Sequence, residues 1–298
     1  MSPPLVSVLI PAHRAAFYLG QTLASVAAQT WPHWEVLVFE DGVVDDSAAI
    51  VRAFAATTTN RVELRQSPSN LGVSRARNAL LDTARGTHVA FLDADDTWEP
   101  DHLAYALQCL DTDHAAWFVG GSNYIDPLGR LTRRNVLPPA TPAAEIPTRL
   151  LQHNFVLTGA VVARAEVFAD GLRFDPSLKI GEDLDLWIRL VGAGHRLAFG
   201  TRATFNYRKH PASTTADPVR FPEEFAVLFE KHLDNPAVDR RVCGRLLAEM
   251  LVNVARMTWR REPRRARAVL ARLFRLSLWQ PRAWPYWLLA RRPSAPTS

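Results

Sequence analysis

The sequence predicts an α/β fold in which a central, mostly parallel sheet is flanked by helices. Short apolar runs of strand length alternate with segments of helical periodicity, and three of these runs end in polar residues, at 11–14, 40–42 and 93–96. Ligands of such sheets bind beyond the carboxyl ends of the strands. We therefore expect the three polar ends to converge on one crevice.

Four strands are expected in the first hundred residues, at 6–10, 35–39, 61–65 and 88–92. Apart from the short third run, these segments are mainly apolar, as strands buried on both faces are. Between the first two, Leu19, Leu23 and Val26 recur at helical spacing.

Two further helices follow in this region. One comes after a capping region at 45–47, and Ser74 is expected to cap the other. The four strands and their helices thus alternate throughout the first part of the chain.

The second part of the chain is less regular. Pro100 suits the first turn of a helix that continues with apolar residues to Leu110. A helix is also expected at 183–191, and the chain beyond about residue 220 reads as helical. Short strands are expected in four places: 116–120, 122–125, 195–199 and 203–207.

Composition is that of a globular protein, with 48% apolar and 22% charged residues among 298. Cys109 and Cys243 lie far apart, and their spacing fits buried thiols in a reducing cytoplasm rather than a metal site. We see neither a signal peptide nor 18 consecutive apolar residues. We therefore expect a cytoplasmic protein.

Charge is unevenly distributed along the chain. From Arg240 onward there are fourteen arginines and two glutamates, a net +12, so the first 239 residues carry −7 of the total +5. Such an asymmetry indicates different partners for the two parts.

Asp93, Asp95 and Asp96 follow the fourth strand, and three carboxylates so close together repel one another. A divalent cation bound to a diphosphate relieves that repulsion, and oxygen ligands suit Mg²⁺ or Mn²⁺. The alternative is an acidic loop that caps the helix at Pro100. Glu40-Asp41 is a weaker signal of the same kind, with helix capping as its alternative.

The order of segments resembles the family 2 glycosyltransferases, which have the GT-A fold. The resemblance spans roughly residues 5–215 and rests on the whole series rather than on any one piece. The matching segments are Val6-Ser7-Val8-Leu9-Ile10-Pro11-Ala12, residues 25–30, residues 35–42, Asn70-Leu71-Gly72, Ala76-Arg77-Asn78, residues 86–96, Gly181-Glu182-Asp183-Leu184-Asp185-Leu186-Trp187 and Tyr207-Arg208-Lys209-His210.

The resemblance implies a nucleotide-sugar donor held at the strand ends. Pro11, Ala12 and His13 would cradle the nucleotide base, and Asp41 would pair with the base ring. Arg77 would lie near the nucleotide.

The resemblance also implies where the ribose and the metal are held. Asp93, with Ala94 beside it, and Asp95 would hold them, with Asp96 close by. His210 would face the metal and diphosphate, and its alternative role is to support the sheet.

The pair Glu182-Asp183 opens a helix and, by the resemblance, supplies the catalytic residues, with Asp183 as the base. Inverting transfer needs one positioned carboxylate on the acceptor side, whereas hydrolases flank the bond with two. The alternative is an acidic pair that only caps the helix. Asp185 is not chosen.

The sequence departs from the family pattern at two strand ends. His13-Arg14 stands where a Tyr-Asn pair is common, and Val43 stands where the family usually has a serine. His13 could still stack on a base, and Arg14 adds charge toward a phosphate. The hydroxyl lost at Val43 would alter the details of donor binding. Trp98 is interpreted either as part of the acceptor site or as an anchor at the start of a helix.

The expected organisation is a catalytic domain at 1–220 and a basic helical extension at 221–298. Within the first, about 1–115 would bind the nucleotide sugar and about 116–220 the acceptor, a saccharide or lipid-linked saccharide. A role in bacterial cell-envelope polysaccharide biosynthesis is implied by the family alone.

The extension combines apolar helical stripes with arginines and with aromatic residues between Trp279 and Trp287. Peripheral contact with the inner face of the membrane and packing against the catalytic domain are the two alternatives. Nucleic-acid binding is not expected, because no recognition motif accompanies the charge.

Two rival functions remain open. A sugar nucleotidyltransferase is disfavoured because the first strand lacks a glycine-rich loop with a lysine. A non-catalytic nucleotide-sugar binding module is disfavoured because Asp93, Asp95 and Asp183 are all present.

Overall fold

The computed structural model describes residues 3–43, 45–210 and 220–276. The chain forms two compact units, one of residues 1–146 with 154–211 and one of residues 147–153 with 212–298. Residues 147–153 therefore belong with the C-terminal unit. The expected division at residue 220 stays a prediction. The expected functional halves of the catalytic domain stay a prediction.

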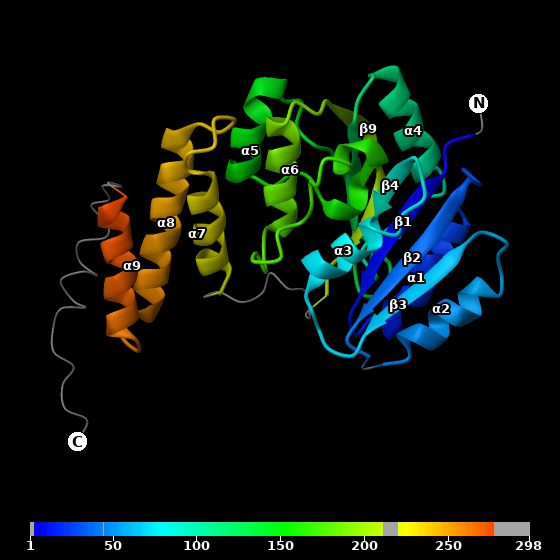
Figure 1. Cartoon of the computed structure of the whole chain (residues 1–298), viewed down its shortest axis with the longest axis horizontal. Helices are drawn as coiled ribbons and strands as arrows, with labels where there is room; N and C mark the ends of the chain where they lie inside the picture. Colours follow the sequence, from blue (N-terminus) through cyan, green and yellow to red (C-terminus); the bar gives the residue numbers. More distant parts are fainter. Residues whose placement is uncertain (1–2, 44, 211–219, 277–298) are drawn as a thin grey trace. The chain divides into compact units, whose positions relative to one another are not determined.

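A single sheet of nine strands runs through the described part of the first unit, in the order β3-β2-β1-β4-β8-β6-β9-β5, with β7 paired to β6 (Figure 1). The strands are β1 (Val6–Ala12), β2 (Trp34–Asp41), β3 (Val62–Ser67), β4 (His88–Phe91), β5 (Thr97–Trp98), β6 (Trp117–Ile125), β7 (Leu131–Val136), β8 (Val161–Arg164) and β9 (Leu197–Arg208).

The first four strands are parallel, as predicted. Strand β8 runs antiparallel to both β4 and β6, and β6 is parallel to β9. The carboxyl ends of β1, β2 and β4 therefore lie side by side at one edge of the sheet.

The helices of this unit are α1 (Ala16–Ala27), α2 (Ser47–Ala55), α3 (Val73–Leu81), α4 (His102–Thr112) and α6 (Glu182–Gly192), with short 3-10 turns at Ala143–Glu145, Thr158–Ala160 and Ala165–Phe168. Helices α1 and α2 pack on each other, and α3 packs on β1 and β2. Right-handed crossovers place α3 on the opposite face of the sheet from α1 and α2.

An aromatic core lies beneath α6. Phe91 of β4 meets Phe174 and Trp187 edge to face at 5.5 and 6.0 Å between ring centres, and Trp117 of β6 stacks on Trp187 at 5.5 Å. Trp117 and Trp187 are fully buried. These contacts fix α6 against the sheet, so the N-terminus of α6 has a defined place beside β4.

Two strands are longer than predicted. The expected pairs of short strands at 116–125 and 195–207 are single strands, β6 and β9. The ladder between them shifts register around Gly121 but does not break. A β-bulge inserts a residue without ending the pairing, which is why the sequence looked interrupted there.

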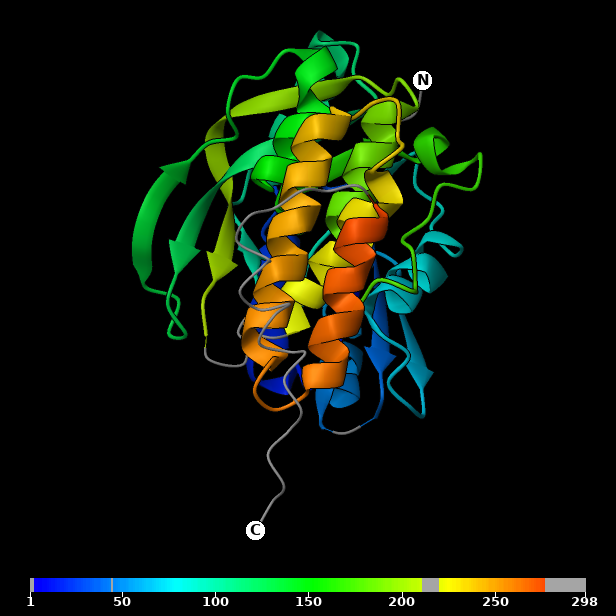
Figure 2. The same ribbon diagram turned by 90° about the vertical axis from the view of Figure 1, so that its left-hand side faces the viewer.

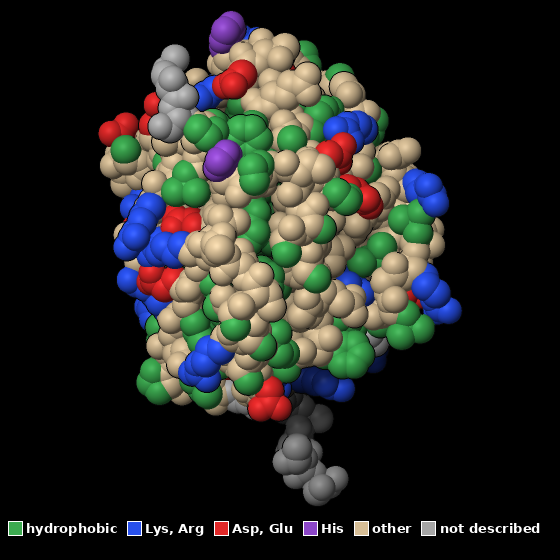
Figure 3. Space-filling view, turned by 90° about the vertical axis from the view of Figure 1, so that its right-hand side faces the viewer, with side chains coloured by type: hydrophobic (Ala, Val, Ile, Leu, Met, Phe, Trp, Pro, Cys, Tyr) green, Lys and Arg blue, Asp and Glu red, His purple; other side chains and the backbone are tan. Residues whose placement is uncertain are grey.

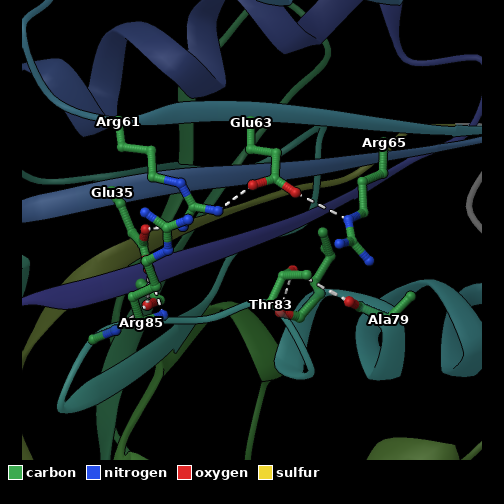
Figure 4. Close-up of polar contacts among 10 residues, drawn as sticks. Glu35, Arg61, Glu63, Arg65, Ala79, Thr83 and Arg85 are labelled. Atoms are coloured by element: carbon green, nitrogen blue, oxygen red, sulfur yellow. Dashed lines mark hydrogen bonds and ion pairs between the residues drawn. The ribbon is translucent and has the colours of Figure 1, made fainter.

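The amino ends of the parallel strands are joined by a polar network around Glu35 (Figure 4). The Glu35 carboxylate accepts hydrogen bonds from the Ser7 hydroxyl at 2.6 Å and the Arg85 backbone N–H at 2.7 Å, and it pairs with Arg61. Glu35 is 2% exposed. The backbone at Gly86 passes so close to β1 that a side chain there would collide with the Leu5 carbonyl. This network is structural.

Charges of both signs are mixed on the face drawn in Figure 3, where Lys and Arg side chains lie next to Asp and Glu along one edge. This face shows no extended patch of one sign.

The described part of the second unit is helical, with α5 (Ile146–Gln152), α7 (Arg220–His232), α8 (Arg240–Thr258) and α9 (Pro263–Arg275). Helix α8 packs against both α7 and α9, and α8 and α9 lie side by side in Figure 2. Asp239 caps α8 by accepting from the backbone N–H groups of Arg241 and Val242.

The apolar stripes predicted for the extension are largely buried. Leu247, Leu251, Leu270 and Leu273 are each at most 1% exposed. None of the described helices is long and apolar enough to span a membrane. The aromatic and arginine residues predicted to contact a membrane between Trp279 and Arg292 lie outside the described residues.

Candidate active site

The carboxyl ends of β1 and β2 bring together the residues expected at the nucleotide base. Pro11 and Ala12 are paired in register with Phe39 and Glu40. The exposed His13 lies beyond them, with its Nδ1 2.5 Å from the Asp41 carbonyl oxygen. His13 and Asp41 therefore belong to one local structure.

Asp41 is 4% exposed and holds the loop that leads into α3. Its Oδ1 accepts from the Leu71 backbone N–H at 2.6 Å, and its Oδ2 accepts from that of Gly72 at 2.8 Å. Gly72 precedes the helix with φ of 95°, where a glycine is favoured. The prediction that Ser74 caps α3 was wrong, because Ser74 lies inside the helix and Gly72 takes that position.

The rim of this region is apolar. Val43, at the departure from the family pattern, is 53% exposed, and Leu71 is 41% exposed. Val43 lies close to Asp41 in the chain. Leu71 is close to it because its backbone N–H donates to the Asp41 carboxylate. Exposed apolar side chains beside a hydrogen-bonding carboxylate suit a flat heteroaromatic ring.

Arg77 of α3 links the strand end to α6. Its guanidinium donates to Asp93 Oδ1 at 2.7 Å and to Glu182 Oε1 at 2.8 Å, and the side chain is 4% exposed. Burial alone would lower the pKa of Arg77, but the carboxylates of Asp93 and Glu182 outweigh it and raise the pKa. Arg77 is therefore a fixed cation between two acidic segments.

Asp95 faces His210, with 2.8 Å between Oδ2 and Nε2. The Asp95 carboxylate is 38% exposed, and the His210 ring lies 5.3 Å from that of Tyr18. Burial and the neighbouring Asp93 charge raise the pKa of Asp95, against the influence of His210. A bound cation would relieve the repulsion that this rise reflects.

Asp96 differs from its two neighbours. It is 1% exposed, and its Oδ1 accepts from the Arg208 backbone N–H at 2.7 Å. Burial, together with Asp95 and Asp93, raises the pKa of Asp96 well above its ordinary value. Asp96 therefore stabilises β9 from the protein interior, and we do not propose it as a metal ligand. Ala94 is also buried, and its carbonyl accepts from the Thr22 hydroxyl at 2.9 Å.

Asp183 lies in the first turn of α6, directly after Gly181 and Glu182. Its Oδ2 is 3.2 Å from the Thr158 hydroxyl and 3.4 Å from the Asn154 amide nitrogen, and the residue is half-buried. Burial raises the pKa of Asp183, although Arg77 lowers it. The carboxylate is thus oriented by two neutral side chains and by the Leu184 backbone N–H, which donates to its Oδ1 at 2.7 Å. Among the described residues, no cation lies within hydrogen-bonding distance of it.

Glu182 is more deeply placed, with 8% of the residue exposed. Burial and the Asp183 charge raise the pKa of Glu182 to about 7, although Arg77 opposes them. The two carboxylates predicted to act together therefore have different partners. Glu182 contacts Arg77, whereas Asp183 contacts Thr158 and Asn154. Asp185 is fully buried and pairs with Arg189 at 2.7 Å.

The fit of a metal ion can be judged from Asp95 and His210. Within the described residues, no group of three or more His, Cys, Asp or Glu side chains is arranged to hold a cation. Mg²⁺ commonly uses only one or two protein carboxylates and completes its shell with water and substrate phosphates. The Asp95–His210 pair, with Asp93 in electrostatic range, fits a metal of that kind.

Sequence reasoning missed several residues that shape this site. Arg208 is 1% exposed and donates to the Asp95 carbonyl at 2.7 Å and the Gln21 side chain at 2.9 Å. An arginine among polar neighbours reads as exposed, so only its position at the end of a strand could have signalled this. Thr158 and Asn154 lie in an apolar segment that carries no motif.

Trp98 is an anchor rather than part of the site. It is 4% exposed, stacks on His102, and donates from Nε1 to the Gly159 carbonyl at 2.7 Å. This supports the interpretation of Trp98 as a helix-start residue over its interpretation as an acceptor contact.

The family model "Glycosyl transferase family 2" matches residues 7–170, more than half of the chain. The chain belongs to this family. The matched range includes the ends of β1, β2 and β4 and the Arg77 cation. It stops before α6, so the match covers the proposed donor side of this glycosyltransferase and not Glu182, Asp183 or His210.

Relatives of this glycosyltransferase include bacterial proteins of polysaccharide biosynthesis. The putative teichuronic acid biosynthesis glycosyltransferase TuaG of Bacillus subtilis is 28% identical over 64% of this chain and 73% of its own length. The succinoglycan biosynthesis protein ExoO of Rhizobium meliloti is 32% identical over 68% of this chain. That alignment spans 60% of ExoO.

Solved structures confirm the GT-A type fold. S. aureus TarS 1–349 in complex with UDP-GlcNAc superposes with a TM-score of 0.64 at 20% identity, over 96% of this chain and 79% of that one. The mannosyltransferase PcManGT from Pyrobaculum calidifontis, in complex with GDP-Man and Mn²⁺, gives 0.61 at 17% identity, over 97% and 86%.

Proposed function

We propose that this glycosyltransferase moves a sugar from a nucleotide diphosphate sugar to an acceptor hydroxyl with inversion, using Asp183 as the base. The observation that carries the proposal is the Asp183 carboxylate, which is half-buried, held by Thr158 and Asn154, and joined to the strand end through Glu182, Arg77 and Asp93. One oriented carboxylate suits proton removal from an attacking hydroxyl.

The donor is a UDP-sugar in this proposal. His13 and Asp41, with the apolar rim of Val43 and Leu71, would receive the base. Two lone pairs of the Asp41 carboxylate hold the 71–72 backbone, so the base would use a remaining one. The complex of TarS with UDP-GlcNAc supports a UDP donor, since both chains share the fold.

Asp95 and His210 would hold a divalent ion, Mg²⁺ or Mn²⁺, which stabilises charge on the leaving diphosphate when bound. The Mn²⁺ in the PcManGT complex supports such an ion in this fold. Asp93 would orient the ribose while Arg77 keeps the Asp93 carboxylate in place.

Glu182, predicted beside Asp183 as a catalytic residue, is a positioning residue in this account. It contacts Arg77 and not the open side of Asp183. Removal of its charge would loosen Arg77, which also holds Asp93. We therefore expect Glu182 to influence both the donor side and the base without contacting substrate.

The acceptor is a saccharide or a lipid-linked saccharide, and the role is bacterial cell-envelope polysaccharide synthesis. The names of TuaG and ExoO support this assignment.

Peripheral membrane contact would rest on exposed arginines such as Arg264 and Arg267, because the apolar faces of α8 and α9 are largely buried. Pelleting with anionic vesicles at low but not high salt would support it; no pelleting at low salt would contradict it.

The proposed reaction is tested by incubating the purified chain with a panel of nucleotide sugars, acceptor saccharides and Mg²⁺ or Mn²⁺. We expect release of free nucleoside diphosphate, abolished by excess chelator. Release of pyrophosphate would indicate a nucleotidyltransferase. Donor binding without any release across the panel would indicate a binding module.

A further inference from the structure

One face of β9 carries a row of side chains that begins near the proposed base, Asp183. Side chains alternate along a strand, so Phe205, Tyr207 and Lys209 share this face, whereas Arg208 points to the other. The Phe205 ring packs so closely on Gly159 that a side chain there would collide with it. Gly159 follows Thr158, which contacts Asp183. The row therefore begins near the proposed base at Phe205, and Tyr207 and Lys209 follow at increasing distance along the strand.

Two tyrosines lie further along this row. Tyr124 of β6 is paired in register with Tyr207 of β9, and their rings meet edge to face at 5.5 Å. Both are half-buried. Among the described residues, neither hydroxyl has a hydrogen-bond partner, although a tyrosine hydroxyl usually finds one when covered. The pair offers ring surface and two free polar groups.

Two exposed cations lie over the Tyr124 ring. The Lys209 Nζ is 4.8 Å from the ring centre, and the Arg133 guanidinium carbon is 6.0 Å from it. Neither has an ion-pair partner in the part of the chain that the structure describes. Arg130, on the same hairpin, contrasts with them because it pairs with Asp126 at 2.7 Å.

The Tyr207 hydroxyl stays protonated on this face. Burial, and then the nearby carboxylates of Asp96, Asp95 and Asp93, raise the pKa of Tyr207 to about 12. The hydroxyl can therefore donate a hydrogen bond to a sugar at neutral pH.

We propose that Tyr124, Tyr207, Lys209 and Arg133, here called the tyrosine–cation platform, bind an acceptor sugar that carries a carboxylate. The Tyr207 ring would pack on the apolar C–H face of the sugar, and the two tyrosine hydroxyls would bond to its hydroxyl groups. The planar guanidinium of Arg133 matches a carboxylate, and Lys209 adds a second charge. This inference rests on the proposed function, because it assigns the acceptor of the same site.

The platform is tested by measuring the binding of p-nitrophenyl β-glucuronide and p-nitrophenyl β-glucoside to the full chain by NMR titration. The two probes differ only in the carboxylate. We expect the glucuronide to bind about tenfold more tightly, the scale of one charge-assisted hydrogen bond. Equal affinities would overturn the proposal. Tighter binding of the glucoside 6-phosphate than of the glucuronide would overturn the choice of a carboxylate.

The double variant Lys209→Gln with Arg133→Gln should lose the preference for the glucuronide while keeping its affinity for the glucoside. Arg130→Gln removes a charge from the same hairpin outside the platform, so it should retain the preference. A preference that survives in the double variant, or disappears equally in Arg130→Gln, would contradict the assignment.

Donor turnover separates this inference from the proposed function. Slow transfer of sugar from the donor to water needs no acceptor, so release of nucleoside diphosphate by the wild type tests the proposed function independently of the platform. Failure of the wild type to turn over any donor would contradict the proposed function, whereas the binding preference would still report on the platform.

Discussion

The carboxylates at the amino edge of the parallel strands are fully hydrogen-bonded, whereas those near the carboxyl edge are incompletely paired. At the amino edge, Glu35 is bound by Ser7, Arg61 and the Arg85 backbone, so its carboxylate is fully engaged within the protein. At the carboxyl edge, Asp183 and Asp95 lie among other carboxylates, with raised pKa values and partly open surfaces.

This difference indicates which carboxylates serve the fold and which are available to a ligand. Removal of one partner of a fully hydrogen-bonded buried charge destabilises the fold, whereas an incompletely paired acidic cluster is typical of functional sites. Arg77 belongs to both categories, because it is a buried structural cation whose two partners are Asp93 and Glu182.

The largest effect should come from removal of Arg77. Arg77→Met leaves the Asp93 and Glu182 carboxylates without their shared cation, and we expect a loss of about 3–5 kcal/mol in the free energy of unfolding, together with loss of transfer. Chemical denaturation and a transfer assay measure both. Arg75→Met, on the exposed face of the same helix, is the matched control and should change neither. Equal free energies of unfolding for the two variants would contradict the role of Arg77 as the shared cation of Asp93 and Glu182.

Glu35→Gln should separate stability from activity. We expect a loss of about 2 kcal/mol in the free energy of unfolding, because the Arg61 side chain and two hydrogen-bond donors lose a charged acceptor. The folded protein should keep its kcat, since the amino edge is remote from the proposed site. Glu63→Gln, which also contacts Arg61 but is 30% exposed, should cost less. A large fall in kcat for Glu35→Gln would show that the two edges are coupled.

The pH dependence of stability should differ between wild type and Glu182→Gln. Because the folded pKa of Glu182 is raised to about 7 from 4.5, its contribution to stability is complete below the unfolded value and is lost as pH rises through the folded one. The variant should therefore gain in relative stability between about pH 4.5 and 7. Urea unfolding across this range tests the shift, and a difference independent of pH would contradict it.

The smallest effect should come from the exposed pair at the edge of β3. Arg65 and Glu63 are 3.0 Å apart with side chains 43% and 30% exposed, and such pairs contribute below about 1 kcal/mol. Arg65→Ala should leave the unfolding midpoint and the transfer rate nearly unchanged. A destabilisation comparable to that of Glu35→Gln would mean that exposure does not distinguish the charges of this network.

The strands and their convergence could be predicted because apolar runs and polar ends are local patterns. The bridge from Arg77 to Glu182 could not, because it joins residues 105 positions apart and depends on how α6 packs. The triplet at 93–96 gave no sign that Asp96 turns inward to bind the β9 backbone. Sequence patterns therefore identify the group of acids, and packing decides which of them remain partly exposed.

Asp183→Asn tests the central claim most directly, because the amide keeps the shape of the side chain but cannot accept a proton. Nucleotide-sugar affinity and transfer rate should be measured on the same preparation of this variant. We expect the donor Kd and the melting temperature to stay close to wild type while kcat falls by about 10²–10⁴-fold, the usual contribution of a general base. Transfer at the wild-type rate in Asp183→Asn would contradict the account.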